Sequence, residues 1–429
     1  MSGNIVLGAG IAGLAAAWRA RELGAAMTLY EAAQTAGGLL DSFEVEGWRF
    51  DNGVHLSFAT EPEVRAVFDL TPYIEHDAVS LNWDRERWLR HPVQNNMFPL
   101  PAAEKTALIA GLVERPELEV RTYRDWLLYQ YGEAIAERWP LEYTRKYWTV
   151  DAQDLGIDWI GNRMRRADIR EVLFGAMSPE PTNTYYISKM RYPVRGGYRG
   201  FIEPLIEGAD IRAGHRAVSV DWRQRVVRFS TGDEVSYDTM INTIPLPALV
   251  GMMTDVPADV RDAAATLFAT RLDLISVGIA RPDVSPSLWF YIYDPDILAA
   301  RVYSPSWKAP ANAPEGHSSL QFEIYSSPRA PQTATVEEMK QNCLDAMEKM
   351  GLARRDEVVL LHHKSLPYGN VVFDTGMEAR RDLVVSWVRS CGIELAGRFG
   401  EWAYLWSNQS FMSGRRAAEA ALGRGAGTA

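Results

Sequence analysis

The sequence predicts an α/β protein in which a doubly wound, mainly parallel sheet is interrupted by two insertions. A short apolar strand, Ile5 to Leu7, runs into a glycine-rich turn and then into a helix, which is typical of the first unit of such a sheet. From about residue 60 to 185 the pattern changes to helices rich in Leu, Ala, Trp and Tyr. Strands separated by turn residues then recur, which predicts a mixed or antiparallel sheet in a later part of the chain.

The glycine-rich turn has the spacing of a dinucleotide-binding loop. Gly8 permits the tight turn, Gly10 lets a pyrophosphate approach the backbone, and Gly13 allows close packing of helix on strand. The helix N-terminus offers unpaired N–H groups to phosphates, so we also expect contacts from Ile11 and Ala12. A second strand, 27–30, ends in Glu31, which is placed to take the hydroxyl pair of a ribose.

Further motifs beyond this loop resemble those of FAD proteins of the amine oxidase and protoporphyrinogen oxidase type. The chain has Gly37-Gly38-Leu39 after Glu31, and then Asp51-Asn52-Gly53-Val54-His55. The resemblance implies FAD rather than NAD as the cofactor, and a Rossmann-like FAD domain of the GR2 type. It also implies that the backbone of Val218 contacts adenine and that His55 tunes the flavin.

The length of 429 residues predicts two or three domains. We expect an FAD-binding domain from 1–58, 190–255 and 371–422, a mainly helical inserted domain over 59–189, and a substrate-binding sheet domain over 256–370. Residues 423–429 are expected to form a disordered tail.

The elements follow this division. In the inserted part, 103–113 and 123–142 are predicted helices, and aromatic residues of the second recur at helical spacing as a packing face. Another helix is predicted to start in the segment that begins at Arg195 and to run through Leu205. A meander over 217–237 and an apolar strand over 240–244 return to the first domain. The strands expected in the third domain are 275–279, 289–293 and 319–325, with a helix over 335–350, and 393–422 reads as strand, loop and helix.

Composition limits the partners and the location. The formal net charge of −10 argues against a nucleic acid, but it does not exclude a phosphorylated small molecule that binds local arginines. No apolar run is long enough for a membrane span, and no signal pattern precedes the first strand, so we expect a cytoplasmic protein. The chain has two cysteines, Cys343 and Cys391, which argues against a disulfide framework or a zinc site. The sequence leaves a homodimer open.

The segment from Tyr143 to Arg166 is similar to the nucleotide-sugar segment of UDP-galactopyranose mutases. It reads Tyr-Thr-Arg-Lys-Tyr-Trp148, followed by Arg163-Met-Arg-Arg166. The resemblance implies that Tyr143 and Trp148 line the nucleotide-sugar pocket and that Arg163 holds the pyrophosphate, with Arg166 as the other candidate. Arginine suits that role because its planar guanidinium pairs bidentately with phosphate. The proline that separates the arginines in that family is missing here.

The C-terminal segment resembles the same mutases. Gly397-Arg398 is followed by an aromatic pair that ends at Tyr404, and the helix that starts near Gln409 would point its N-terminal end at the flavin. Further candidates for the flavin side are Ser407 and Asn408. Further candidates for the substrate side are Tyr368, Tyr185, Arg191 and Arg271.

The resemblance therefore implies an FAD-dependent mutase that interconverts the pyranose and furanose forms of a nucleotide sugar through a covalent adduct at flavin N5. His55, Arg163, Tyr368 and Tyr404 are the catalytic candidates. NAD(P)H or another reductant would reduce the flavin. The alternative is an oxidase or dehydrogenase of the amine oxidase type that acts on an amine or a secondary metabolite. It is favoured by Gly38-Leu39 and by Phe58, where the mutases carry Gly-Asn and a second histidine.

Overall fold

The computed structural model describes residues 3–161, 164, 168–180 and 189–425. Its first sheet has the strand order β10-β11-β12-β1-β2-β9, and β18 also pairs with β12. The pairs β12–β1, β1–β2, β2–β9 and β12–β18 are parallel, whereas β10, β11 and β12 form an antiparallel meander. The strand bounds are β1 Gly3–Leu7, β2 Thr28–Tyr30, β9 Asp210–Arg212, β10 Ala217–Asp221, β11 Val226–Phe229, β12 Glu234–Asn242 and β18 Ile393–Leu395.

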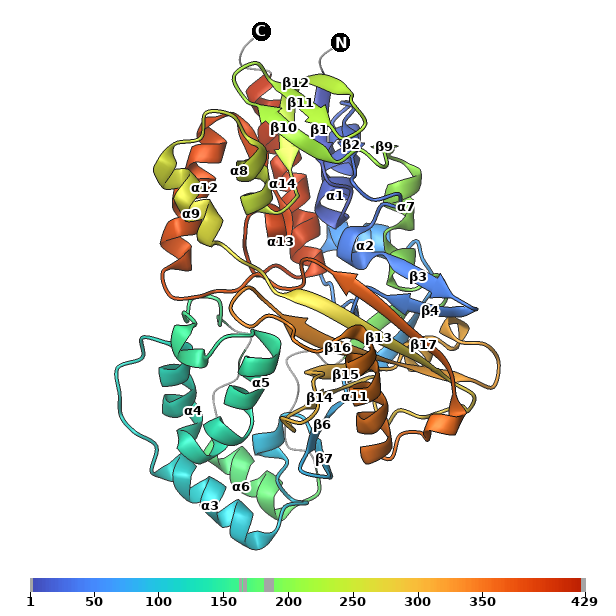
Figure 1. Ribbon diagram of the computed structural model, residues 1–429, viewed down its shortest axis with the longest axis vertical. Coiled ribbons are helices and arrows are strands. Elements are labelled where there is room, and N and C mark those ends of the chain that lie inside the picture. Colours follow the sequence, from blue (N-terminus) through green and yellow to red (C-terminus); the bar gives the residue numbers. More distant parts are fainter. Residues whose placement is uncertain (1–2, 162–163, 165–167, 181–188, 426–429) are drawn as a thin grey trace.

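Helices cover both faces of this sheet, as the apolar composition of its parallel strands requires. Val6 packs on one face with α1 (Ile11–Glu22) and α14 (Ser407–Gly425), which lie side by side (Figure 1). Ile5 and Leu7 pack on the other face. The helices on that face are α8 Leu246–Met252, α9 Ala258–Thr266 and α12 Met377–Ser390.

The second sheet has the order β17-β13-β16-β15-β14-β6-β7 and is antiparallel except for the β14–β6 pair. One face packs on α11 (Val336–Lys349), whose Met339, Cys343 and Met347 join the core under β13 and β16. The other face is directed towards the cavity described below. The strand bounds are β6 Ser80–Asp84, β7 Arg87–Arg90, β13 Arg271–Ile279, β14 Trp289–Ile292, β15 Arg301–Tyr303, β16 Ser318–Ser326 and β17 Val358–Leu366.

A helical part lies beside the second sheet, at the opposite end of the molecule from both termini (Figure 1). It consists of α3 Ala102–Val113, α4 Tyr123–Arg138, α5 Pro140–Tyr147 and α6 Ile169–Met177. Thr122 and Asp125 form a capping box at the start of α4. The remaining elements connect the parts: β3 Ser42–Val45, β4 Trp48–Asp51, α2 Pro62–Phe68, β5 Tyr73–Asp77, β8 Lys189–Pro193, α7 Glu203–Glu207, α10 Pro305–Lys308, α13 Gly397–Gly400 and several short 3₁₀ helices.

Several sequence predictions differ from the structure in their boundaries. The helix expected over 123–142 is broken twice. Gly132 leaves the helical conformation where its Cα meets the backbone of Gly111 in α3, and Trp139 separates α4 from α5. The end of the meander expected over 217–237 and the strand expected at 240–244 form one strand, β12.

Two domain boundaries differ as well. Residues 80–90 were expected in the helical insertion, but β6 and β7 belong to the second sheet. The helix α14 continues to Gly425, past the expected start of the tail at 423, and residues 426–429 lie outside the described part of the chain. In the described residues, no helix is both long and apolar enough to cross a membrane.

Candidate active site

One large cavity, of about 890 Å³, opens where the three parts of the molecule meet. Its first half is lined by the loops at the carboxyl ends of the parallel strands, which is where open α/β sheets bind ligands. Its second half lies between α4, α5 and the inner face of the second sheet. The lining residues that the sequence predicted are Gly8, Gly10, Ile11, Ala12, Glu31, Gly37, Gly38, Leu39, Asn52, Gly53, Val54, His55, Tyr143, Trp148, Gly397, Arg398, Tyr404 and Ser407.

The glycine loop of the first half has the space that a pyrophosphate needs. Gly10 is the N-cap of α1, and a Cβ built on it would meet nothing within 4 Å, so the backbone faces open cavity. Gly13 lies outside the lining, as expected for a packing glycine, because its Cβ would lie 2.1 Å from the Gly8 carbonyl oxygen. The N–H groups of the first turn of α1 are therefore available to an anion.

Glu31 lies at the end of β2 and faces the same cavity. Its Oε2 accepts a hydrogen bond from the Ala9 N–H at 2.8 Å, and its Oε1 accepts one from the Ala33 N–H at 2.8 Å. These bonds orient the carboxylate beside the glycine loop. The arrangement fits a ribose hydroxyl pair, as the spacing predicted.

The N-terminal helix α1 and the segment that precedes α14 meet at this half of the cavity. The Gly397 N–H donates to Ser413 Oγ of α14 at 2.8 Å, and the Gly397 Cα approaches Ala12 so closely that a Cβ would lie 2.7 Å from its methyl group. Arg398 donates from Nε to the Leu405 carbonyl at 2.9 Å and from Nη1 to Asn370 Oδ1 at 3.1 Å. Because both partners are neutral, its positive charge stays uncompensated by them at the cavity wall.

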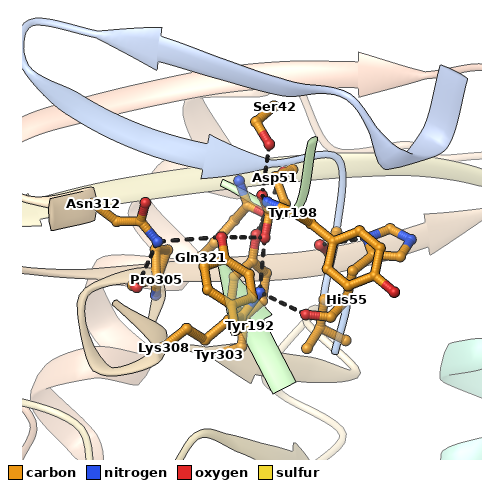
Figure 2. A network of polar contacts seen from close by, with 12 residues as sticks. Ser42, Asp51, His55, Tyr192, Tyr198, Tyr303, Pro305, Lys308, Asn312 and Gln321 are labelled. Atoms are coloured by element: carbon orange, nitrogen blue, oxygen red, sulfur yellow. Dashed lines mark hydrogen bonds and ion pairs between the residues drawn. The ribbon is translucent and has the colours of Figure 1, made fainter. Parts of the chain in front are cut away.

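The loop from Asn52 to His55 rests on a buried polar network around Asp51 (Figure 2). Asp51 Oδ1 accepts from Ser42 Oγ at 2.8 Å and from the Tyr198 N–H at 2.9 Å. Its Oδ2 accepts from Tyr192 Oη at 2.8 Å and from Lys308 Nζ at 2.9 Å. Four donors thus satisfy one carboxylate that is 1 % exposed.

Lys308 is the counter-ion of this carboxylate and is fully buried. Its ammonium lies 4.0 Å from the Tyr303 ring centroid and also donates to the His55 carbonyl at 3.3 Å. Burial would raise the pKa of Asp51, but the Lys308 charge and the Tyr198 N–H outweigh it and hold that pKa below its usual value. Burial lowers the pKa of Lys308, and the Asp51 carboxylate opposes that effect. The Asp51 carboxylate therefore stays ionised beneath the loop of residues 52–55.

His55 lies at the end of this loop against Tyr198, with ring centroids 5.3 Å apart. Its Nδ1 lies 3.0 Å from the Gly53 carbonyl, so Nδ1 carries the proton of the neutral ring. Burial lowers the pKa of His55 to about 4, and the charge of Asp51 offsets only part of that effect. The side chain is therefore a neutral imidazole at neutral pH.

The second half of the cavity is an aromatic cage. Tyr143 and Tyr147 of α5 stack with ring centroids 5.3 Å apart, and Trp148 contacts Tyr404 at 5.5 Å. Burial raises the pKa of both α5 tyrosines, so their phenols stay protonated as hydrogen-bond donors. The other Phe, Tyr and Trp lining residues of the cavity are Phe58, Tyr123, Tyr131, Trp139, Trp159, Trp289, Tyr291, Tyr293, Tyr325, Phe399 and Trp406.

The sequence analysis missed a buried ion pair in the wall of this cage. Arg301 of β15 and Glu323 of β16 face the cavity, and Glu323 is fully buried. Arg301 Nε and Nη2 both lie 2.7 Å from Glu323 Oε2. Although burial by itself would lower it, the Glu323 carboxylate raises the pKa of Arg301 well above its usual value, so the guanidinium stays charged. The sequence did contain one signal for this pair. Glu323 lies in the middle of the apolar strand 319–325, and a buried charge needs a partner.

The other predicted site residues lie away from the cavity. Arg191 donates from Nη2 to the Ala59 carbonyl, and Tyr368 packs on Phe399 behind the wall. Arg271 is 55 % exposed and pairs with Asp273, so it does not line the cavity as a phosphate arginine would. Val218 is 51 % exposed on β10 and is not a lining residue either.

At the start of α14, Asn408 Nδ2 donates to Glu61 Oε1, and Gln409 Oε1 accepts from the Trp406 N–H, so both amides support the helix start outside the lining. Arg163, Arg166 and Tyr185 lie outside the described residues, and their proposed roles stay predictions. Within the described ranges, no cluster of His, Cys, Asp and Glu is arranged to hold a metal ion.

Comparisons with known proteins agree with this geometry. A family model described as NAD(P)-binding Rossmann-like domain matches residues 6–70, and one described as flavin containing amine oxidoreductase matches residues 128–422. The structure is similar to that of a reduced UDP-galactopyranose mutase, with a TM-score of 0.92 and 26 % identity over 99 % of this chain and 96 % of that one.

Two further relatives are more distant. A putative protoporphyrinogen oxidase from Exiguobacterium sp. 255-15 has a TM-score of 0.72 and 16 % identity over 98 % of both chains, which shows the shared fold. A 1-hydroxycarotenoid 3,4-desaturase from Flavobacterium sp. (strain P99-3) is 33 % identical over 112 residues, which is 24 % of this chain and 23 % of the desaturase. The match thus spans about a quarter of that protein.

The residues present fit FAD. The glycine loop and α1 would hold the pyrophosphate, Glu31 the ribose, and the 52–55 loop with Gly397 and Arg398 the flavin end. The fold, the cavity and the family match converge on one assignment: the chain is an FAD-dependent flavoprotein that belongs to the flavin containing amine oxidoreductase family.

Proposed function

We propose that the protein is an FAD-dependent nucleotide-sugar mutase that interconverts the pyranose and furanose forms of a nucleoside-diphosphate sugar. The observation that carries the proposal is the orientation of Arg301. Its Nε and Nη2 are held by Glu323, and Nη2 also donates to Tyr325 Oη at 3.3 Å. Among the described residues, Nη1 has no hydrogen-bond partner. A charged donor therefore remains for a ligand anion inside an aromatic cage.

The cage suits a nucleotide sugar in its other features. Tyr143 and Trp148 provide flat apolar faces for a base or a sugar, and protonated phenols provide donors for hydroxyl and phosphate oxygens. The similarity to a reduced UDP-galactopyranose mutase over nearly the whole chain supports the same class of substrate. When bound and reduced, FAD would supply the nucleophile for the anomeric carbon. The protein would supply the phosphate grip, the orientation of the sugar and the exclusion of water.

The second candidate is an oxidase of the amine oxidase type, which the family match favours. An aromatic cage can attract an ammonium group, but the described residues of this cage offer that group no free carboxylate. The described lining of the cavity contains two carboxylates, Glu31 beside the glycine loop and Glu323, and both oxygens of Glu323 already accept hydrogen bonds. The described lining contains no lysine.

Turnover of nucleotide sugars tests the proposal. The purified holoprotein is reduced with dithionite and incubated with UDP-galactopyranose and other nucleotide sugars, and pyranose and furanose forms are separated by chromatography. Exchange is expected with reduced but not with oxidised protein. Hydrogen peroxide formed in proportion to an amine substrate, without binding of any nucleoside diphosphate, would favour the oxidase instead.

A matched pair of variants tests the phosphate grip. Arg301→Met should weaken UDP binding by about 1.5–3 kcal/mol, because a charge-assisted hydrogen bond is lost. Arg271→Met makes the same substitution on an exposed arginine outside the cavity and should leave UDP affinity unchanged. Equal affinities of the two variants in calorimetric titrations would contradict the role of Arg301.

A further inference from the structure

Glu323 touches both halves of the cavity at once. Its Oε2 accepts from Arg301 on the substrate side, and its Oε1 accepts from the Val54 N–H of the flavin-side loop at 2.7 Å. Residues 54 and 323 are far apart in sequence and belong to different parts of the fold. A single buried carboxylate thus joins the phosphate arginine to the backbone that would face the flavin.

The local geometry makes this link stiff. Gly53 adopts a φ of +98°, and a Cβ on it would lie 3.2 Å from Glu323 Oε1, so a glycine lets the loop approach the carboxylate. Tyr325 Oη donates to Glu323 Oε2 at 2.8 Å and fixes the carboxylate from the side. On the far side of the loop, Lys308 holds the His55 carbonyl. Residues 53–55 are therefore held between two buried charges.

We propose that Glu323 is a positioning residue that couples nucleoside-diphosphate binding at Arg301 to FAD binding at the 53–55 loop. This inference rests on the proposed function for its phosphate ligand. When a diphosphate engages Arg301 Nη1, the guanidinium is fixed, Glu323 is fixed with it, and the Val54 N–H keeps a single geometry. Such coupling is reciprocal, so each ligand raises the affinity of the other by the same factor.

The variant Glu323→Gln separates this role from simple wall packing. Glutamine keeps the shape but has one acceptor oxygen, so it cannot serve both Arg301 and Val54. Glu357→Gln is the matched control, because it makes the same substitution on an ion-paired carboxylate that lies outside the cavity lining.

The experiment measures two quantities on the holoprotein: UDP affinity by calorimetry, and the rate of FAD release by loss of the bound-flavin spectrum. UDP is used because it carries the diphosphate that would bind Arg301 but lacks the sugar. In the wild-type protein, saturating UDP is expected to slow FAD release at least threefold. In Glu323→Gln, saturating UDP should no longer slow FAD release, even where UDP still binds. Glu357→Gln should keep both properties within threefold.

The ratio of release rates with and without UDP is insensitive to a general loss of stability, so it reports the coupling itself. If UDP slows FAD release equally in Glu323→Gln and in the wild-type protein, the coupling role is wrong while the proposed function stands. Wild-type protein that binds neither UDP nor inorganic pyrophosphate would overturn the proposed function, and the coupling with it.

Discussion

A single added methyl group should have different effects at Gly10 and at Gly13, two glycines of the same motif. At Gly10, a Cβ would project into open cavity, and the backbone angles (φ −77°, ψ 179°) suit any residue. At Gly13, a Cβ would lie 2.1 Å from the Gly8 carbonyl oxygen and 3.2 Å from a Val6 methyl carbon. Gly10→Ala should therefore affect the ligand, and Gly13→Ala should affect the fold.

The expected magnitudes follow from these distances. Gly10→Ala exchanges one N-cap residue for a poorer one and reduces the freedom of the unfolded chain, and these opposing effects leave the stability of the apoprotein within about 1 kcal/mol of wild type. The methyl group occupies the approach of the pyrophosphate. Loss of two charge-assisted hydrogen bonds there costs about 3 kcal/mol or more, which is at least a hundredfold in FAD affinity. Gly13→Ala forces α1 away from β1 and should cost at least about 3 kcal/mol of stability.

Urea denaturation of the apoproteins and titration of each with FAD separate the two effects. Gly10→Ala should unfold near the wild-type midpoint and bind FAD weakly, whereas Gly13→Ala should unfold early or fail to accumulate as folded protein. A Gly10→Ala variant with wild-type FAD affinity would refute the assignment of the pyrophosphate to this loop. A Gly13→Ala variant as stable as wild type would refute the packing argument.

Three further changes test other parts of the site. Glu31→Gln should weaken FAD binding by about 1.5–3 kcal/mol in fluorescence titrations, since a charged acceptor for the ribose is lost; unchanged affinity would remove Glu31 from the ribose site. Lys308→Met leaves the buried Asp51 carboxylate without its counter-ion and should cost about 3–5 kcal/mol in urea denaturation, with part of the loss recovered when Asp51→Asn is added; a cost below about 1 kcal/mol would show that Asp51 is neutral. Burial lowers the pKa of His91 from 6.5 to about 4, so the unfolded chain takes up a proton first, and His91 alone should lower stability by about 2 kcal/mol between pH 7 and pH 5. His91→Gln should show a pH dependence smaller by that amount, and parallel curves for the two proteins would contradict the shift.

The first half of the site could be predicted from the sequence because its geometry is local. Gly8, Gly10 and Gly13 act through the backbone of one turn, and Glu31 ends the next strand, so spacing along the chain fixes spacing in the fold. The aromatic residues Tyr143, Trp148 and Tyr404 could be placed only by resemblance. Their contact joins α5 to the C-terminal segment, and no periodicity within one element reports it.

The buried charges could not be placed in this way. Asp51 pairs with Lys308 across different parts of the fold, and Glu323 pairs with Arg301 on the neighbouring strand of the same sheet. A sequence shows that a charge within an apolar strand needs a partner, but not which of many cations supplies it. Arg271 illustrates the ambiguity: it opens a strand of the same sheet as Arg301, yet its side chain is exposed and paired with Asp273.

The two described arginines of the cavity also differ in what they offer a ligand. Glu323 neutralises most of the field of Arg301, so that arginine acts mainly as a directed donor, and its affinity for a diphosphate depends on geometry. Arg398 is held by a carbonyl and an amide oxygen, so its charge reaches the cavity uncompensated by these partners. A chain with a net charge of −10 can therefore bind two anionic groups. The long-range electrostatic field of the protein governs the rate at which an anionic ligand meets it. A desolvated guanidinium within hydrogen-bond distance governs the affinity for that ligand.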